Sequence, residues 1–519
     1  MAERSEVVPK DGLSLTEASG ASTEIDQEKQ HETGDAGETG EETTADEYPH
    51  GLKLGFIILA IMLATFMIAL DQTILGTAIP KITDQFGGLD KVSWYGSAYF
   101  MTYGGFQPSL GKVYRYFSLK TTFLVLLFIF KLGSLICGVA QNSSTLVISF
   151  MIIAFSSEPK KRPLFTGLVR SMYSVSAVSG PLISSAFSNK VSWRWLTAAD
   201  IFFFFCTLNR AKPIKVNWKK RILNIDLVSI SLTISLIMRF ILALEYRGQS
   251  RAWNSSMVIR LLISVVAILI TLAMFMWCLL KQCPLWAAST YMFFLAGSYF
   301  ILLYYLLIYF QSIHNTRPIS SGVCNLPMVI TFSIGAILAG VFVKKTGLIT
   351  PVMVMGSALA TIRSSLIYIW DLDTPAGKWI GYQILVAFGF VIPYLGPLNI
   401  AQANAEPQDI STVTAIIFLF QTLGGAFGIS AAQSAFVNTL LKELRTTAPG
   451  IVPMQVIATG ATQIREAFPD DIHGVLLAYM EGLQATFAIA TGMVGVAFLV
   501  AFFSPWKRLH RIPETVGFA

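Results

Sequence analysis

The sequence predicts an all-α integral membrane protein. The chain has 519 residues, of which 54% are hydrophobic and only 13% are charged, and its mean hydropathy is +0.59. A soluble domain of this length could not bury so much apolar surface, so much of it must face lipid. The apolar stretches are continuous rather than alternating, which predicts membrane-spanning helices and excludes a β-barrel.

Twelve apolar stretches have the length of a membrane-spanning helix, which needs roughly 20 such residues. These predicted spans are 54–76, 92–113, 120–140, 164–187, 226–244, 258–280, 289–311, 320–343, 349–370, 379–403, 412–437 and 483–504. Two further apolar stretches, 145–157 and 196–208, are shorter.

The placement of Lys and Arg favours counting both short stretches as spans. Basic clusters begin at Lys112, Lys160, Arg210, Lys344 and Lys507. With fourteen spans and a cytoplasmic N-terminus, all of these clusters fall in the cytoplasm, as the positive-inside rule leads us to expect. The same topology places the segment 439–481 outside, together with the sequon Asn254-Ser-Ser, which predicts glycosylation at Asn254.

The first fifty residues differ sharply in charge from the rest of the chain. Residues 1–50 hold 14 acids and three bases, a net charge of −11, and the remainder holds 17 acids and 35 bases, a net charge of +18. The acidic segment is poor in aromatic residues and predicts a disordered cytoplasmic tail. The bases of the remainder lie in short clusters between apolar stretches, which is typical of a membrane protein and not of a nucleic-acid-binding one.

Asp71 is the first candidate functional residue. It lies near the end of the first apolar stretch, which begins near Gly55. A carboxylate in or beside a membrane span is costly to bury, so it is a functional candidate by default. The alternative is an interfacial Asp that caps the next element.

Several motifs, in their order and spacing, resemble those of the major facilitator superfamily. Over residues 50–510 the chain is similar to the fourteen-span drug:proton antiporters, in the fungal branch that exports toxins and other small metabolites. The matching blocks are Asp71-Gln72-Thr73 with Ala78-Ile79-Pro80, the loop Gly111 to Lys120 with Lys112 and Arg115, Gly180-Pro181, Ser192-Trp193-Arg194-Trp195, Tyr304-Tyr305 to Gln311, and Ser321-Gly322-Val323 with Leu326-Pro327.

The resemblance implies a major facilitator fold, in which two six-helix bundles are joined by two extra central helices. The domains would then be an N-terminal bundle at 51–208, a basic linker with the two extra spans at 209–288, a C-terminal bundle at 289–504, and a cytoplasmic tail at 505–519. It further implies a gating loop at Gly111–Lys120, an antiporter motif at Gly180-Pro181, and a monomer with no cofactor.

The chain departs from the family pattern in several places. Arg115 replaces the acid that is common in the gating loop, and Ser184-Ser185 replace the glycines that follow Gly180-Pro181. The stretch 145–157 lacks the Arg and the glycines of the family's fourth helix. At about 1.5 Å per residue it covers roughly 20 Å, less than the ~30 Å bilayer core. Two interpretations stay open, a degenerate family member or a gene model that lacks coding segments.

From the resemblance and the residues together, we expect proton-coupled efflux of small amphipathic organic molecules, with Asp71 as the coupling carboxylate. Residues that could contact substrate are Arg170, Tyr304, Tyr305, Gln383, Gln402, Gln421 and Gln433. For Arg170 the alternative is a side chain that snorkels to the cytoplasmic face, and for the glutamines it is interhelical hydrogen bonding.

An enzyme is not expected. The chain has no Walker loop, and its five cysteines lack the spacing of a zinc site. Two other functions stay open, a transport-deficient sensor and proton-coupled uptake of an iron chelate or nutrient. We expect the plasma membrane as the location, with a vacuolar or vesicle membrane as the alternative.

Overall fold

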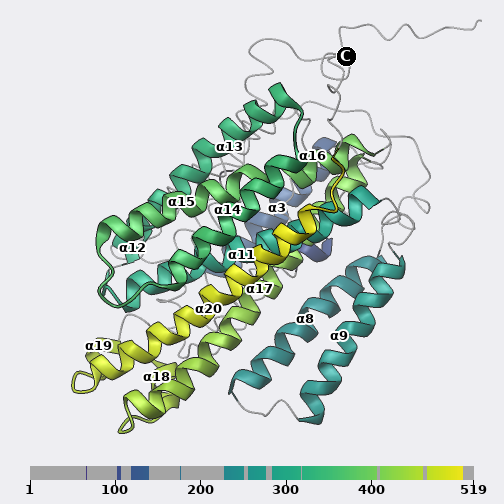
Figure 1. Ribbon diagram of the computed structural model, residues 1–519. Helices are drawn as coiled ribbons and strands as arrows, with labels where there is room; N and C mark the ends of the chain where they lie inside the picture. Colours follow the sequence, from purple (N-terminus) through teal and green to yellow (C-terminus); the bar gives the residue numbers. More distant parts are fainter. Residues whose placement is uncertain are drawn as a thin grey trace, which may run out of the picture. The chain divides into compact units, whose positions relative to one another are not determined.

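The computed structural model describes residues 66, 102–106, 119–138, 176, 227–249, 255–275, 283–316, 318–405, 410–459 and 464–506. The chain divides into two compact units, Met1–Tyr48 and Pro49–Ala519, and every described residue belongs to the second. These residues form helices and their connections, with no strand among them. Figure 1 shows the helices, of which those after residue 283 form one bundle.

Three long helices form the centre of the C-terminal bundle. They are α11 (Cys283–Ser312), α17 (Ile410–Thr447) and α20 (Ile472–Ala501), and each packs extensively against the other two. Around them lie α13 (Leu326–Thr346), α14 (Thr350–Tyr368) and α15 (Ala376–Tyr394). Helix α15 contacts both α13 and α14, and α14 also packs against α20, so the six helices close into one bundle.

Glycines allow α11 and α17 to approach closely. A Cβ atom at Gly424 would overlap the carbonyl oxygen of Phe293, and one at Gly428 would lie 3.0 Å from the Cα atom of Gly297. Gly424 and Gly428 are four residues apart and therefore lie on one face of α17. This is the small-residue packing by which membrane helices gain van der Waals contact.

Two of the predicted spans contain a break. The predicted span 320–343 consists of α12 (Pro318–Cys324) and α13, separated at Asn325, with a proline in the first two positions of α13. The predicted span 379–403 consists of α15 and α16 (Gly396–Ala403), separated at Leu395. Proline has no backbone N–H and clashes with the preceding turn, so Pro327 and Pro397, each at the second position of the helix that follows, account for both breaks.

The helices before residue 276 are described in less detail. Helix α3 (Leu119–Gly138) matches the predicted span 120–140. Helices α8 (Leu227–Gln249) and α9 (Ser256–Phe275) pack against each other and match 226–244 and 258–280. Helix α8 also packs against α17, where Phe240 stacks on Phe427 with ring centroids 3.9 Å apart.

Seven helices in the described part of the chain are long and apolar enough to cross a membrane. This confirms a multi-helix membrane protein, and the count of fourteen spans stays a prediction. Within the predicted outward segment 439–481, α17 continues to Thr447 and α20 begins at Ile472. Only the short helices α18 (Pro453–Ala458) and α19 (Ile464–Ala467) lie between them.

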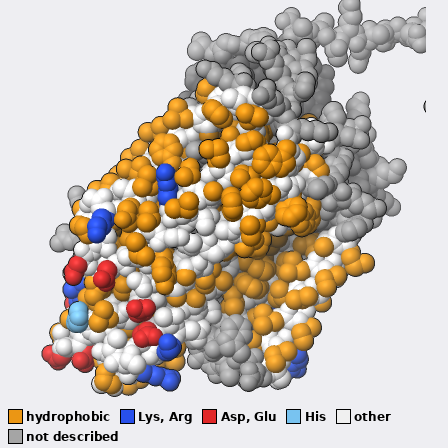
Figure 2. Space-filling model, viewed as in Figure 1, with side chains coloured by type: hydrophobic (Ala, Val, Ile, Leu, Met, Phe, Trp, Pro, Cys, Tyr) orange, Lys and Arg blue, Asp and Glu red, His pale blue; other side chains and the backbone are white. Residues whose placement is uncertain are grey.

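Hydrophobic and charged side chains occupy different parts of the face that Figure 2 shows. Figure 2 shows hydrophobic side chains over most of the helical surface, with charged side chains gathered at the end that carries α18 and α19. A helix surface that contacts lipid is apolar, and the ends beyond the hydrocarbon are polar.

Candidate functional site

Most of the predicted site residues in the N-terminal half lie outside the described residues. These are Asp71, Gly111, Lys112, Arg115, Arg170, Gly180, Pro181 and the sequon residue Asn254. Lys120 lies in the first turn of α3, and its side chain is outside the description. Their roles stay predictions.

Tyr305 joins two central helices through a buried hydrogen bond. Its hydroxyl donates to Oε1 of Gln433 over 2.9 Å, which ties α11 to α17. Both side chains are buried, as is Tyr304 on the same helix. The two tyrosines therefore lie within the packed interior of the bundle. A substrate could reach them only if the helices separated.

The other predicted glutamines also bond within the protein. Nε2 of Gln383 donates to the carbonyl oxygen of Cys324 over 3.0 Å, and Nε2 of Gln402 donates to Oγ1 of Thr414, also over 3.0 Å. These bonds support the interhelical interpretation. Gln421, like Gln383, has a buried Oε1 without a hydrogen-bond partner. It is the one predicted pocket glutamine for which the structure gives no interhelical bond.

An aromatic cluster within the C-terminal bundle was not predicted. Tyr299 of α11 lies 5.0 Å from Phe332, 6.0 Å from Phe390 and 6.0 Å from Tyr394, measured between ring centroids. Phe332 comes from α13, and the other two come from α15. Phe332 and Tyr394 are only partly buried. Since aromatic residues are common throughout the spans, nothing in the sequence marked these four.

Among the side chains that the structure describes, no acidic one is buried, and the buried polar ones are those of Ser, Thr, Asn and Gln. Glu481 in α20 is exposed, and Glu443 near the end of α17 pairs with Lys442 over 3.1 Å. No group of His, Cys, Asp or Glu among these residues could hold a metal ion. The interior described here therefore offers amide, hydroxyl and aromatic contacts.

A short piece of the second predicted span contacts both α17 and α8. A Cβ atom at Gly104 would lie 2.9 Å from Cγ2 of Thr422, and one at Gly105 would lie 2.6 Å from Cγ1 of Ile234. Within the N-terminal half, the Ser176 hydroxyl donates to the carbonyl oxygen of Phe66 over 2.9 Å. Residues 102–106 thus link the predicted N-terminal half to the C-terminal bundle.

Polar and charged residues meet at the end of the bundle where α11 stops. The Tyr309 hydroxyl donates to the carbonyl oxygen of Asp371 over 3.1 Å and lies 3.1 Å from Nε2 of His314. Nη2 of Arg465 donates to the carbonyl oxygen of Ile313 over 2.8 Å. Burial lowers the pKa of His314 below its ordinary value of 6.5, and the Arg465 charge lowers it further while Asp373 opposes the change.

Solved structures of transporters share this fold. The chain resembles an inward-facing, unoccupied bacterial homolog of the human lysosomal transporter Spinster, with a TM-score of 0.59, 13% identity, and coverage of 88% of this chain and 98% of that one. It resembles a D-xylose-proton symporter with a TM-score of 0.53, 11% identity, and coverage of 88% and 100%. At this identity the likeness shows the fold alone.

Sequence relatives are fungal transporters. The chain is 65% identical to the MFS-type transporter grgE of Penicillium sp, over 93% of this chain and 92% of that one. It is 44% identical to the probable efflux pump gsfJ of Penicillium aethiopicum, over 90% of each. The family model described as Major Facilitator Superfamily matches residues 61–429. The chain is therefore a multi-pass membrane protein of the Major Facilitator Superfamily, whose members are transporters of small molecules and not enzymes.

Proposed function

We propose that this protein exports small amphipathic organic molecules in exchange for protons. The observation that carries the proposal is its similarity along nearly the whole chain to fungal proteins named as transporters and efflux pumps. The interior of the C-terminal bundle agrees with such cargo, because it offers aromatic rings and neutral hydrogen-bonding groups. Ligand sites for organic molecules are mostly apolar, with a few placed polar groups.

Asp71 is the proposed proton-coupling residue. Protonation removes the charge of a membrane carboxylate and changes the free-energy difference between two conformations that bury it differently. The described part of the C-terminal bundle holds no buried acid that could do this. Asp71, in the first predicted span, is the candidate for the coupling step.

Efflux from intact cells tests the proposal. Cells that lack their own pumps would be loaded with a fluorescent amphipathic dye and followed with and without an uncoupler. We expect wild type to expel the dye only while the proton gradient exists, and Asp71→Asn to retain it. Glu481→Gln is the matched control, since Glu481 is an exposed acid in α20, and it should expel dye like wild type.

Other outcomes would contradict the proposal. Dye accumulation driven by the gradient would indicate uptake. Equal efflux by Asp71→Asn and wild type, at matched membrane levels, would remove Asp71 from the coupling step. Correct insertion of wild type without flux of a panel of amphipathic dyes would favour the sensor.

A further inference from the structure

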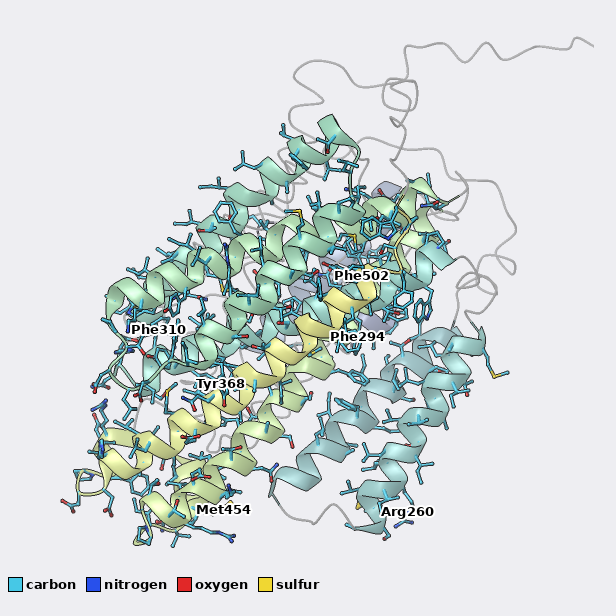
Figure 3. All side chains as sticks on the ribbon, in the orientation of Figure 1. Arg260, Phe294, Phe310, Tyr368, Met454 and Phe502 are labelled. Carbon is cyan, nitrogen blue, oxygen red and sulfur yellow. The ribbon has the colours of Figure 1, made fainter. Side chains whose placement is uncertain are left out.

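Three buried amide side chains converge on one turn of chain at the break between α12 and α13. Nε2 of Gln311 donates to Oγ of Ser321 over 2.9 Å, and Nε2 of Gln383 donates to the carbonyl oxygen of Cys324. Asn325 follows Cys324 directly, and its backbone N–H bonds back to the carbonyl oxygen of Ser321. Gln311 comes from α11 and Gln383 from α15, so three segments contribute. Phe310, labelled in Figure 3, marks this end of α11.

Each of these amides leaves its oxygen without a hydrogen-bond partner. Oε1 of Gln311, Oδ1 of Asn325 and Oε1 of Gln383 are all buried and unpaired. The exposed fractions of the three residues are 1%, 3% and 0%. An unpaired buried polar atom destabilises the folded protein because it has lost its hydrogen bonds to water. Three such acceptors close to one turn of chain indicate an occupant that neutralises their partial charges.

The helix break adds to this excess of acceptors. Asn325 is the N-cap of α13, yet its side chain makes no capping bond. A cap oxygen normally accepts from the second or third helical N–H, and the second position here is Pro327, which has none. Pro327 likewise supplies no N–H for the carbonyl of Val323, four residues earlier. Broken membrane helices expose carbonyl oxygens in this way, and such oxygens coordinate Na⁺ in other transporters.

We propose that Gln311, Ser321, Asn325 and Gln383 form a binding site for a monovalent metal cation. Oxygen atoms are the ligands of hard cations, and carbonyl oxygens can replace the hydration shell of Na⁺ or K⁺. The four side chains are neutral, which suits a monovalent ion better than a divalent one, whose desolvation neutral ligands could not offset. The four residues do not include Asp71, and cation binding by them does not depend on the transported molecule.

Thermal unfolding of the purified protein tests the cation site without a transport assay. Wild type would be compared in NaCl, KCl and N-methyl-D-glucamine chloride at equal ionic strength. A ligand that binds only the folded state raises the unfolding midpoint with its concentration. We expect Na⁺ or K⁺ to raise it by about 3 °C or more. A rise with only one of them would identify the preferred ion, and a rise with both would show a site that accepts either.

Variants assign the effect to these residues. Gln383→Leu should abolish the salt-dependent rise, and Asn325→Ala should do the same if Gln383→Leu does not fold. Gln383→Glu should lower the half-saturating cation concentration, because a carboxylate attracts the ion more strongly than an amide does. Gln484→Leu is the matched control: Gln484 donates to the carbonyl oxygen of Trp370, and its loss should leave the salt effect intact.

Two results would overturn the cation site. One is a wild-type midpoint that is the same in all three salts, which would assign the free oxygens to water. The other is a full Na⁺ or K⁺ effect in well-folded Gln383→Leu and Asn325→Ala, which would place the ion elsewhere.

Discussion

Helices α9 and α11 are both apolar spans, yet they lie in opposite surroundings. Of the 18 consecutive residues with the highest hydropathy in each helix, 17% are buried within the protein in α9 and 78% in α11. The mean hydropathy of these residues has the opposite order: it is higher in α9, at 2.6, than in α11, at 1.9. The more hydrophobic helix is therefore the less buried one. In a membrane protein, hydropathy marks the surface offered to lipid, and packing is marked by small and polar residues.

The comparison explains what the two helices contribute. Helix α11 carries Tyr305, which bonds to α17, and Ser298, whose hydroxyl donates to the carbonyl oxygen of Ala490 in α20 over 2.7 Å. In described α9, the side-chain bonds of Ser264 and Thr271 return to its own backbone. Helix α11 therefore holds the bundle together, whereas α9 packs mainly against α8.

The largest expected effect is at the glycine crossing of α11 and α17. Gly424→Leu places a side chain on the backbone of Phe293 and should abolish folding of the bundle. Gly340→Leu, in α13, meets no atom within 4 Å of its new Cβ and should be tolerated. Size-exclusion profiles of the two fluorescently tagged variants would measure this. Equal profiles would contradict the close crossing.

Large-to-small changes give the next effect. Leu295 in α11 is fully buried, and Ile263 in α9 is 63% exposed. Leu295→Ala should destabilise the protein by about 2 kcal/mol or more, because it leaves a cavity. Ile263→Ala should change stability by less than about 0.5 kcal/mol. Thermal midpoints at one lipid composition would compare them. A larger loss at Ile263 would mean that α9 packs against protein.

Removal of the Tyr305 hydroxyl should have a smaller effect. Tyr305→Phe keeps the ring and removes the bond to Gln433, which should cost about 0.6–1 kcal/mol. The double variant Tyr305→Phe with Gln433→Leu should cost less than the sum of the single changes, since the two groups bond to each other. Strict additivity would show that the bond contributes nothing.

The smallest expected effect is a pH dependence at His314. Its pKa is lower in the folded protein than the ordinary 6.5, so the unfolded chain takes up a proton more readily as the pH falls. The stability contribution is present above pH 6.5 and is lost as the pH falls toward the folded-state pKa. His314→Gln should flatten the midpoint-against-pH profile in this window. An unchanged profile would assign the dependence to other groups.

Much of the fold could be predicted from the sequence, because long continuous apolar stretches indicate the membrane-spanning helices. The long helices from α8 onward match predicted spans to within about five residues, apart from longer ends in α11, α17 and α20, and the short helices α18 and α19 match none. No break was predicted at Asn325 or Leu395, although Pro327 and Pro397 follow them by two residues. Tolerance of proline in membrane helices makes this signal weak.

The candidate site was less predictable. Gln383 and Gln402 were identified as polar residues within spans, and the structure gives both of them interhelical partners. The position of a single amide side chain in a sequence does not show which group it will bond to in the folded protein. The cluster of Gln311, Asn325 and Gln383 requires Gln383 to meet a turn 59 residues earlier in the chain, so only the folded chain brings it together.

Transport in reconstituted liposomes tests the central claim most directly. Purified wild type and Asp71→Asn would be reconstituted at equal density, with a pH-sensitive dye inside and an imposed gradient of an amphipathic cation or phenol that wild-type cells expel. The account predicts that wild type moves protons against substrate movement and that Asp71→Asn does not. Substrate flux without proton movement in wild type, or unchanged exchange in Asp71→Asn, would contradict it.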